Sequence, residues 1–509
     1  MKILRHSERS EESPAARRRS FALFGAQDDG RRVLLYALVA VAALARLLLQ
    51  VAALPPYAGL DEVWHVARLV FVLQEGRSPD IRESSVAQYL ASATAGDPAY
   101  PADFGHIGAR WPEVVRARPV LVDHAVTANY VRTNIEAQQP RLYYSVVGRL
   151  GHLMPHRTQL NELRYWRLWA VLFGVVTALA TARIGEALYG TRGIAAAALL
   201  VSLPTWLTLV ARASNDGFAC MLLALALASR RPATESIFWA GALATKLYTW
   251  PVAIVLLFRR RHWTVYAACA VSVAFTVFDL ATRTRNPLGV LGFDPAAPTG
   301  APQPIQYFEM LKITLASAVW TSGQHWNALT LRGMVVYAVP VLVLIGIGVW
   351  SRSRGVSGSR GPARPETARL RDLATSLAAF AAAQIVHAFG YIRRAKAMGL
   401  AMPAAGKEGW FWYVLAPLVV ATLFPPAPLA ILAGWLVGWD VVIHEGALFR
   451  DFAGLTSPAT PSWLFRWGPL GVGPFASQLV ALRLLHLGAI IAVFVLESRV
   501  HDRNTHPSD

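Results

Sequence analysis

Apolar residues along the chain gather into blocks close to the length that an α-helix needs to cross a hydrocarbon core, about 20 residues. Polar and basic stretches separate these blocks, as is typical of membrane-spanning helices and their loops. The blocks cover residues 33–54, 163–182, 194–212, 218–229, 263–282, 332–350, 373–392, 411–424, 426–443 and 478–497. We therefore expect an all-α polytopic membrane protein with about 10–12 transmembrane helices.

One further apolar block, residues 237–258, is ambiguous because arginines flank both of its ends. Arg230 and Arg231 precede it, and residues 259–261 are all arginine. A single crossing would place one basic cluster on the outer side, against the positive-inside rule. Two short helices broken near residues 249–251 would keep both clusters in the cytoplasm.

Basic residues also set the expected orientation of the chain and its division into segments. The Arg-rich segment 1–32 is expected to be a cytoplasmic tail before a first span that is retained rather than cleaved. Residues 55–160 form a long outer loop, in which 63–73 and 140–154 have patterns typical of amphipathic interfacial helices. The remaining segments are an Arg/Gly/Ser cytoplasmic linker at 351–372, a set of spans within 373–497 and a cytoplasmic tail at 498–509.

Composition agrees with burial in lipid. Charged residues make up 16% of the chain, whereas soluble domains carry about a quarter. The net charge of +18 suits cytoplasmic loops and also attraction to anionic lipid or to a phosphate-bearing lipid substrate. No basic helix with interleaved aromatic residues occurs, so no nucleic-acid partner is expected. Cys220 and Cys269 lie inside apolar blocks and are expected to be core residues.

An acidic pair follows the first span directly, on the expected outer side. Pro55 and Pro56 end that helix, and Asp61, Glu62 and His65 come next. A carboxylate at a membrane surface can take a proton from a hydroxyl as a general base. The same residues also fit the start of a helix, with Asp61 as its N-cap and Glu62 in its first turn. The segment lacks the H-E-x-x-H pattern of a zinc protease.

Several short motifs occur in a definite order along the chain. The first, P-x-x-x-x-D-E-x-x-H, spans residues 56–65, and residues 139–144 (QPRLYY) are similar to Q-P-P-L-Y-Y. The other motifs are an arginine before the second span (Arg164 or Arg167), an S-N-D-G turn at 214–217, the dipeptide Thr245-Lys246 and an aromatic-rich piece from Trp320 to Trp326. In this order the motifs resemble those of the GT-C superfamily, whose members are membrane glycosyltransferases that take sugars from polyprenyl-phosphate carriers. The chain looks most similar to a bacterial branch related to the protein O-mannosyltransferases.

This resemblance covers most of the chain up to about residue 350, which makes 33–350 a GT-C-like catalytic module. A late R-Y-x-x-P element of the family has only an arginine-free counterpart at 410–417. The resemblance implies transfer of a sugar from a polyprenyl-phosphate donor to a hydroxyl of a glycan, lipid or protein. The active site would face the extracytoplasmic side of a bacterial inner membrane. Asp61, with Glu62 beside it, is then the expected catalytic base, and some branches use a divalent metal there.

A set of residues on or near the expected outer side would bind the substrates, because positive charge stabilises a leaving phosphate. These residues are His65, Arg141, Tyr143, Arg164, Asn215, Asp216, Lys246, Arg283, Arg285 and His325. Most of them also have a plainer interpretation. Arg164, Arg167 and Arg46 fit topogenic or snorkelling roles, Tyr143 and Tyr144 fit interface anchors, and residues 215–216 fit an outer turn.

Two other functions remain open from the sequence. A transporter or flippase of a lipid-linked or small anionic substrate needs ionisable residues at mid-membrane depth. Few such residues occur, and they are Arg46, Lys246, Asp279 and His387. A non-catalytic assembly or anchoring protein would explain the missing late arginine.

Overall fold

A computed structural model describes eight parts of the chain. They are residues 14–53, 62–79, 135–154, 159–203, 206–207, 210–246, 262–284 and 475–505. These parts are helical, with turns and short connections and no strand among them. The predicted spans at 332–350, 373–392, 411–424 and 426–443 lie outside the described residues, as do Asp61, Arg285 and His325.

The described elements follow one another along the chain as long helices and short helical turns. The longer helices are α1 (Pro14–Ala53), α2 (Glu62–Glu75), α6 (Leu142–Leu150), α7 (Gln159–Tyr189), α10 (Asn215–Ala228), α11 (Pro232–Thr245), α13 (Trp263–Thr284) and α21 (Phe475–Thr505). The shorter ones are η1 (Ile135–Gln138), η2 (Gly151–Leu153), η3 (Gly190–Ala195) and α8 (Ala196–Leu200). The all-helical prediction is confirmed for the described residues.

Three helices are long and apolar enough to cross a membrane. The qualifying stretches are Asp29–Val51 in α1, Leu163–Ala187 in α7 and Trp263–Arg283 in α13. They coincide with the predicted blocks at 33–54, 163–182 and 263–282. Two shorter apolar stretches, Asn215–Ala228 and Ala481–Leu496, fall at the predicted blocks 218–229 and 478–497.

Two predicted blocks differ from the helices that form. The block at 194–212 is not one span, because α8 ends at Leu200 and residues 211–214 are bends. Pro204 favours this break, since proline lacks the backbone N–H and disfavours helix at the preceding residue. The ambiguous block at 237–258 begins as α11, which ends at Thr245, with Lys246 in an extended conformation. The expected break near residues 249–251 and the second short helix lie outside the described residues.

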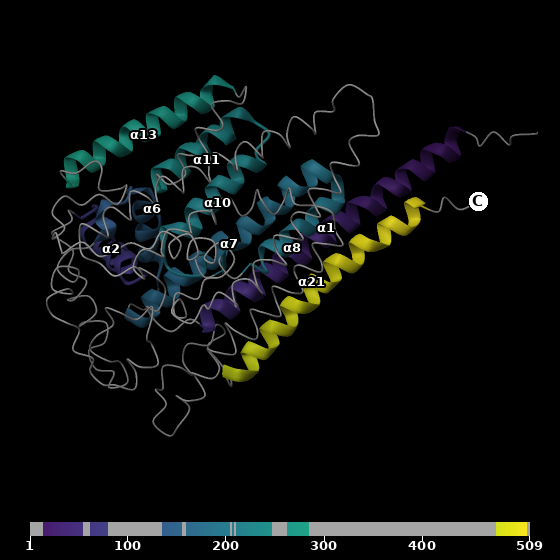
Figure 1. Ribbon diagram of the computed structural model, residues 1–509, viewed down its shortest axis with the longest axis horizontal. Coiled ribbons are helices and arrows are strands. Elements are labelled where there is room, and N and C mark those ends of the chain that lie inside the picture. Colours follow the sequence, from purple (N-terminus) through teal and green to yellow (C-terminus); the bar gives the residue numbers. More distant parts are fainter. Residues whose placement is uncertain are drawn as a thin grey trace, which may run out of the picture.

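The long helices lie side by side in the order α13, α11, α10, α7, α1 and α21, and consecutive members of this series pack against each other (Figure 1). Helices α1 and α7 are antiparallel: Arg32 pairs with Glu186 near one end, and Arg167 reaches the carbonyl of Val51 at the other. The N-terminal end of α1 and the C-terminal end of α21 lie at the same end of the series (Figure 1).

Helices α2 and α6 pack against each other at the end of the series where α1 finishes (Figure 1). The sequence predicts that both lie on the membrane surface, but the structure buries most of α2, with Val66, Leu69 and Arg68 fully covered. Tyr143 and Tyr144 of α6, interpreted as interface anchors, are 1% and 0% exposed. The amphipathic pattern therefore faces protein rather than lipid headgroups.

Candidate functional site

Polar side chains from five helices and the turns between them meet at the end of the series where α1 and α11 finish and α2, α7 and α10 begin. We call this the site end. Most of these groups lie within a few residues of a helix terminus, and the packing of the helices brings those termini close together. Helix termini also leave backbone N–H and carbonyl groups free to bond these side chains.

The first group is an ion pair between Glu62, the first residue of α2, and Arg167 of α7. The Nε and Nη2 atoms of Arg167 donate to the two carboxylate oxygens of Glu62 at 2.8 and 2.6 Å. The backbone N–H of Ala213 donates to the same carboxylate at 2.9 Å. Both side chains are 0% exposed. Arg167 therefore does not snorkel to the surface, and it joins the start of α2 to α7.

The second group surrounds Asp216 in the first turn of α10. Ser214 is the N-cap of this helix, and its hydroxyl accepts from the backbone N–H of Asp216 at 3.3 Å. The Asp216 carboxylate accepts from the side chains of Arg212 and Lys246. Asn215 donates to the carbonyl of Thr245 at 3.5 Å, which ties the start of α10 to the end of α11. The two cations and the helix N-terminus offset the cost of burying the negative charge of Asp216.

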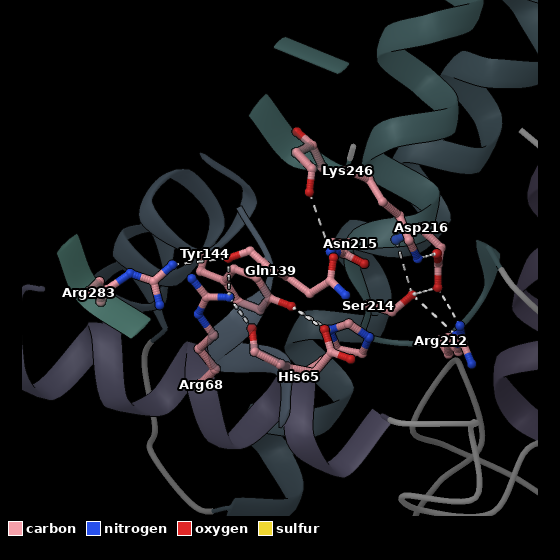
Figure 2. Close-up of polar contacts among 12 residues, drawn as sticks. His65, Arg68, Gln139, Tyr144, Arg212, Ser214, Asn215, Asp216, Lys246 and Arg283 are labelled. Carbon is pink, nitrogen blue, oxygen red and sulfur yellow. Dashed lines mark hydrogen bonds and ion pairs between the residues drawn. The ribbon is translucent and has the colours of Figure 1, made fainter. Parts of the chain in front are cut away.

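The third group links α2 to η1 and α6 through Tyr144. The Tyr144 hydroxyl donates to Glu136 at 3.0 Å, so its oxygen accepts from Nδ1 of His65 at 2.7 Å. The guanidinium of Arg68 lies 3.7 Å from the centre of the Tyr144 ring and donates to the carbonyls of Glu136 and Gln139. Figure 2 shows His65, Tyr144 and Arg68 converging on this point.

Burial sets the protonation states of this third group. It raises the pKa of Tyr144 well above its usual value, and the negative charge of Glu136 adds to the effect. Burial, together with the charges of Asp216 and Glu62, also raises the pKa of the neighbouring Tyr143. Burial lowers the pKa of Arg68 to about 10, which leaves the guanidinium charged at neutral pH. Both phenols therefore stay protonated, and Tyr144 remains a hydrogen-bond donor.

The fourth group lies at the end of α13. Arg283 donates to the carbonyls of Pro79, Ala137 and Gln139. Asp279, one turn earlier, is 3.4 Å from Arg283 and 3.4 Å from Arg141. The Arg141 side chain is 45% exposed and stacks on Phe275. This group forms the most accessible edge of the polar network.

The four groups are neighbours rather than separate sites. Ala213, which bonds Glu62, adjoins Ser214 in the cap of α10. His65 also lies near Asp216. Figure 2 shows His65 between the Tyr144 group and the Asp216 group, with Lys246 and Asn215 above them. We call the four groups together the polar network.

The polar network of the described residues carries more positive than negative charge. Its carboxylates are Glu62, Glu136, Asp216 and Asp279, and its guanidinium and ammonium groups are Arg68, Arg141, Arg167, Arg212, Lys246 and Arg283. Six cations face four anions before His65 is considered. No group of three or more metal-ligating side chains occurs within the described ranges. The surplus favours an anionic ligand near the site end.

Most of the site residues that were expected from the sequence, and that lie within the described residues, come together in the structure. The residues within the polar network are Glu62, His65, Arg141, Asn215, Asp216, Lys246 and Arg283, and Tyr143 lies against it. Arg164 is half-buried in α7, one turn before Arg167. Asp61, Arg285 and His325 lie outside the described residues. The catalytic and binding roles expected of all these residues stay predictions.

Four further residues belong to this network although they were not expected there from the sequence: Arg68, Glu136, Tyr144 and Arg212. Arg68 carried a usable signal, because it interrupts the apolar pattern of 63–73 one turn after His65. Glu136 carried none, because its partners Tyr144 and His65 are recognisable only once α2 and η1 are packed together.

Comparisons with protein-family models, with curated proteins and with solved structures give no match to this chain. The resemblance to the GT-C superfamily therefore depends on the motifs quoted above.

Proposed function

We propose that this chain is a membrane glycosyltransferase of the GT-C type. It would move a sugar from a polyprenyl-phosphate carrier to an acceptor hydroxyl, with inversion at the anomeric carbon, at the extracytoplasmic face of a bacterial inner membrane. The observation that carries the proposal is the buried, cation-rich polar network at one end of the apolar helices, directly beside the sequence position of Asp61.

The surplus positive charge suits the donor. As the bond between the anomeric carbon and the phosphate oxygen breaks, the leaving phosphate takes the electron pair and gains negative charge. Guanidinium and ammonium groups stabilise that charge as it develops. Arg141, at the accessible edge of the network, is the best-placed cation among the described residues.

The acceptor needs a base. Its hydroxyl oxygen attacks the anomeric carbon, and its proton must pass to a carboxylate in the same step. We assign that carboxylate to Asp61. Glu62 is fully occupied by Arg167 and Ala213, which suits a positioning residue that fixes the backbone next to Asp61.

Two buried side-chain oxygens are suited to accept hydrogen bonds from the hydroxyl groups of a sugar. The side-chain oxygens of Asn215 and Gln139 are buried and have no hydrogen-bond partner among the described residues. A buried polar atom without a partner costs about 1–3 kcal/mol, which a ligand can remove. Sugar hydroxyls are donors of the required kind.

The test compares Asp61→Asn with Glu75→Gln, an exposed acid at the end of α2 that serves as the matched control. Membranes containing each full-length variant are supplied with radiolabelled polyprenyl-phosphate sugars, and transfer to endogenous glycans, lipids or proteins is measured. Asp61→Asn should lower transfer by at least about 100-fold, and Glu75→Gln should leave it unchanged. Full transfer by Asp61→Asn would remove Asp61 from the mechanism.

A transporter or flippase is the second candidate, and one observation favours it. Arg46, inside the candidate span of α1, is 1% exposed and does not reach the surface. Buried ionisable residues within spans often mark substrate pathways. Movement of a lipid-linked sugar across proteoliposomes without formation of any glycosidic bond would support this function over the transferase.

A further inference from the structure

A separate polar cluster lies where α1 packs along α21, on the opposite flank of α1 from α11 and α13 (Figure 1). Arg46 and Gln50 come from α1, and Arg483 and His486 come from α21. Arg46, Gln50 and His486 are 1%, 2% and 0% exposed. Arg483 lies 3.3 Å from the His486 ring, and Arg46 lies near the same ring across the contact between the two helices. We call these four residues the α1–α21 cluster.

Hydrogen-bond chemistry shows that the α1–α21 cluster offers donors. Arginine can only donate, so Nη1 of Arg483, 3.3 Å from Nδ1 of His486, makes that nitrogen an acceptor. Nε2 of the same ring must then carry the proton. In the same way, Arg46 donates to Oε1 of Gln50 at 3.2 Å, which leaves the amide NH₂ of Gln50 as a donor.

Two of these donors are unsatisfied within the part of the chain that the structure describes. Nε2 of His486 and Nε2 of Gln50 are buried and have no hydrogen-bond partner there. Burying a donor without an acceptor is costly. Two such donors beside two guanidinium groups call for a ligand that has several acceptor oxygens and a negative charge, and a phosphate group meets both requirements.

The depth of the cluster indicates where that phosphate comes from. Arg46 lies five residues before Val51, the end of the candidate span, and His486 lies five residues after Ala481, the start of the apolar part of α21. At about 1.5 Å per residue, both lie roughly 7–8 Å inside the apolar helices. Leu44 of α1 and Leu485 of α21 are 45% and 52% exposed nearby in sequence. A lipid whose phosphate enters the cluster could lay its chains on such apolar surface.

We propose that the α1–α21 cluster binds the phosphate group of a membrane lipid. The proposal needs α1 and α21 to lie in a bilayer, but it does not need the glycosyltransferase function or Asp61. The lipid is either an anionic phospholipid or a polyprenyl phosphate, because both present the same oxygens at this depth.

Gln50→Glu is the most informative variant. The two side chains have nearly the same size, so packing is kept, while the new carboxylate pairs with Arg46 and repels phosphate. Gln74→Glu makes the same chemical change at an exposed position of α2 and serves as the matched control. His486→Leu, which removes the ring donor without adding charge, tests the same site if Gln50→Glu does not fold.

The experiment is native mass spectrometry and thermal melting of the full-length chain in neutral detergent. The probes are phosphatidylglycerol, farnesyl phosphate and inorganic phosphate, with diacylglycerol and farnesol as phosphate-free controls. We expect at least one of the two phosphorylated lipids to bind the wild-type chain, and its affinity to fall at least about tenfold in Gln50→Glu but not in Gln74→Glu. Whichever lipid binds identifies the source of the phosphate.

Three results would overturn the proposal. They are unchanged lipid binding by Gln50→Glu or its substitute His486→Leu, equal binding of farnesol or diacylglycerol, and binding of inorganic phosphate as tight as that of the lipids. Asp61→Asn should retain the lipid. Loss of sugar transfer without loss of lipid binding therefore separates this site from the proposed active site.

Discussion

Arg167 and Glu62, which are far apart in sequence, form a bidentate ion pair that is fully buried. Its two hydrogen bonds measure 2.8 and 2.6 Å, and a third donor, the backbone N–H of Ala213, completes the shell of Glu62. Removing two charges from water is costly, and only this geometry offsets the cost. The pair fixes the start of α2.

Replacing one residue of the pair should destabilise the protein more than replacing both. Glu62→Gln leaves the buried guanidinium of Arg167 without its counter-charge, which costs about 3–5 kcal/mol. We expect a clear fall in the melting temperature in detergent. The double variant Glu62→Leu with Arg167→Leu should melt closer to wild type than Glu62→Leu alone, because no unpaired charge remains. The exposed acid change Glu75→Gln should have no effect.

A double variant that melts no higher than Glu62→Leu alone would mean that the pair does not hold α2 through charge. In that case the packing of the long side chains, rather than the ion pair, would anchor the start of this helix.

Asp216 should be essential to the stability of the site end. In Asp216→Asn the cations Arg212 and Lys246 lose the carboxylate between them and repel each other across a buried volume. We expect destabilisation of about 3 kcal/mol or more, measured as a lower melting temperature. Adding Lys246→Met should recover part of that loss. Asp29→Asn, at an exposed position in α1, is the matched control, and an equal effect of the two asparagine variants would contradict this account.

Orientation can be tested with two exposed positions at opposite ends of the helix series. His152 follows α6 near the site end, and Arg230 precedes α11 at the other end. The native cysteines Cys220 and Cys269 form no disulfide within the described residues and are first replaced by alanine. A membrane-impermeant maleimide should then label His152→Cys in intact cells and label Arg230→Cys only after permeabilisation. The reverse pattern would place the site end in the cytoplasm.

The sequence predicts the long helices well, for a physical reason. A block of about 20 apolar residues has few structures open to it other than a buried helix. Helices α1, α7 and α13 therefore fall where hydropathy places them. The block at 194–212 is not one helix, and its average hydropathy does not register Pro204, which disfavours helix at the preceding residue.

The polar network is predicted less well, because its residues are defined by partners from distant parts of the chain. An amphipathic helix such as α2 shows that one face will be covered, but not whether lipid headgroups or another helix covers it. An arginine near the end of a span fits snorkelling equally well until its carboxylate is known. For Arg167 that carboxylate is Glu62, and only packing of α2 against α7 reveals it.

The pairing of α1 with α21 has a consequence for how the protein is made. The first described helix reaches its neighbour only after several hundred further residues have been synthesised. At about 5–20 residues per second, α1 waits tens of seconds in the membrane before α21 emerges. Throughout that time the contacts between Arg46 and α21 have not yet formed, although the arginine already lies in a medium that is hostile to charge. Biogenesis factors that shelter polar helices during insertion should therefore matter more for this chain than its high hydrophobicity suggests.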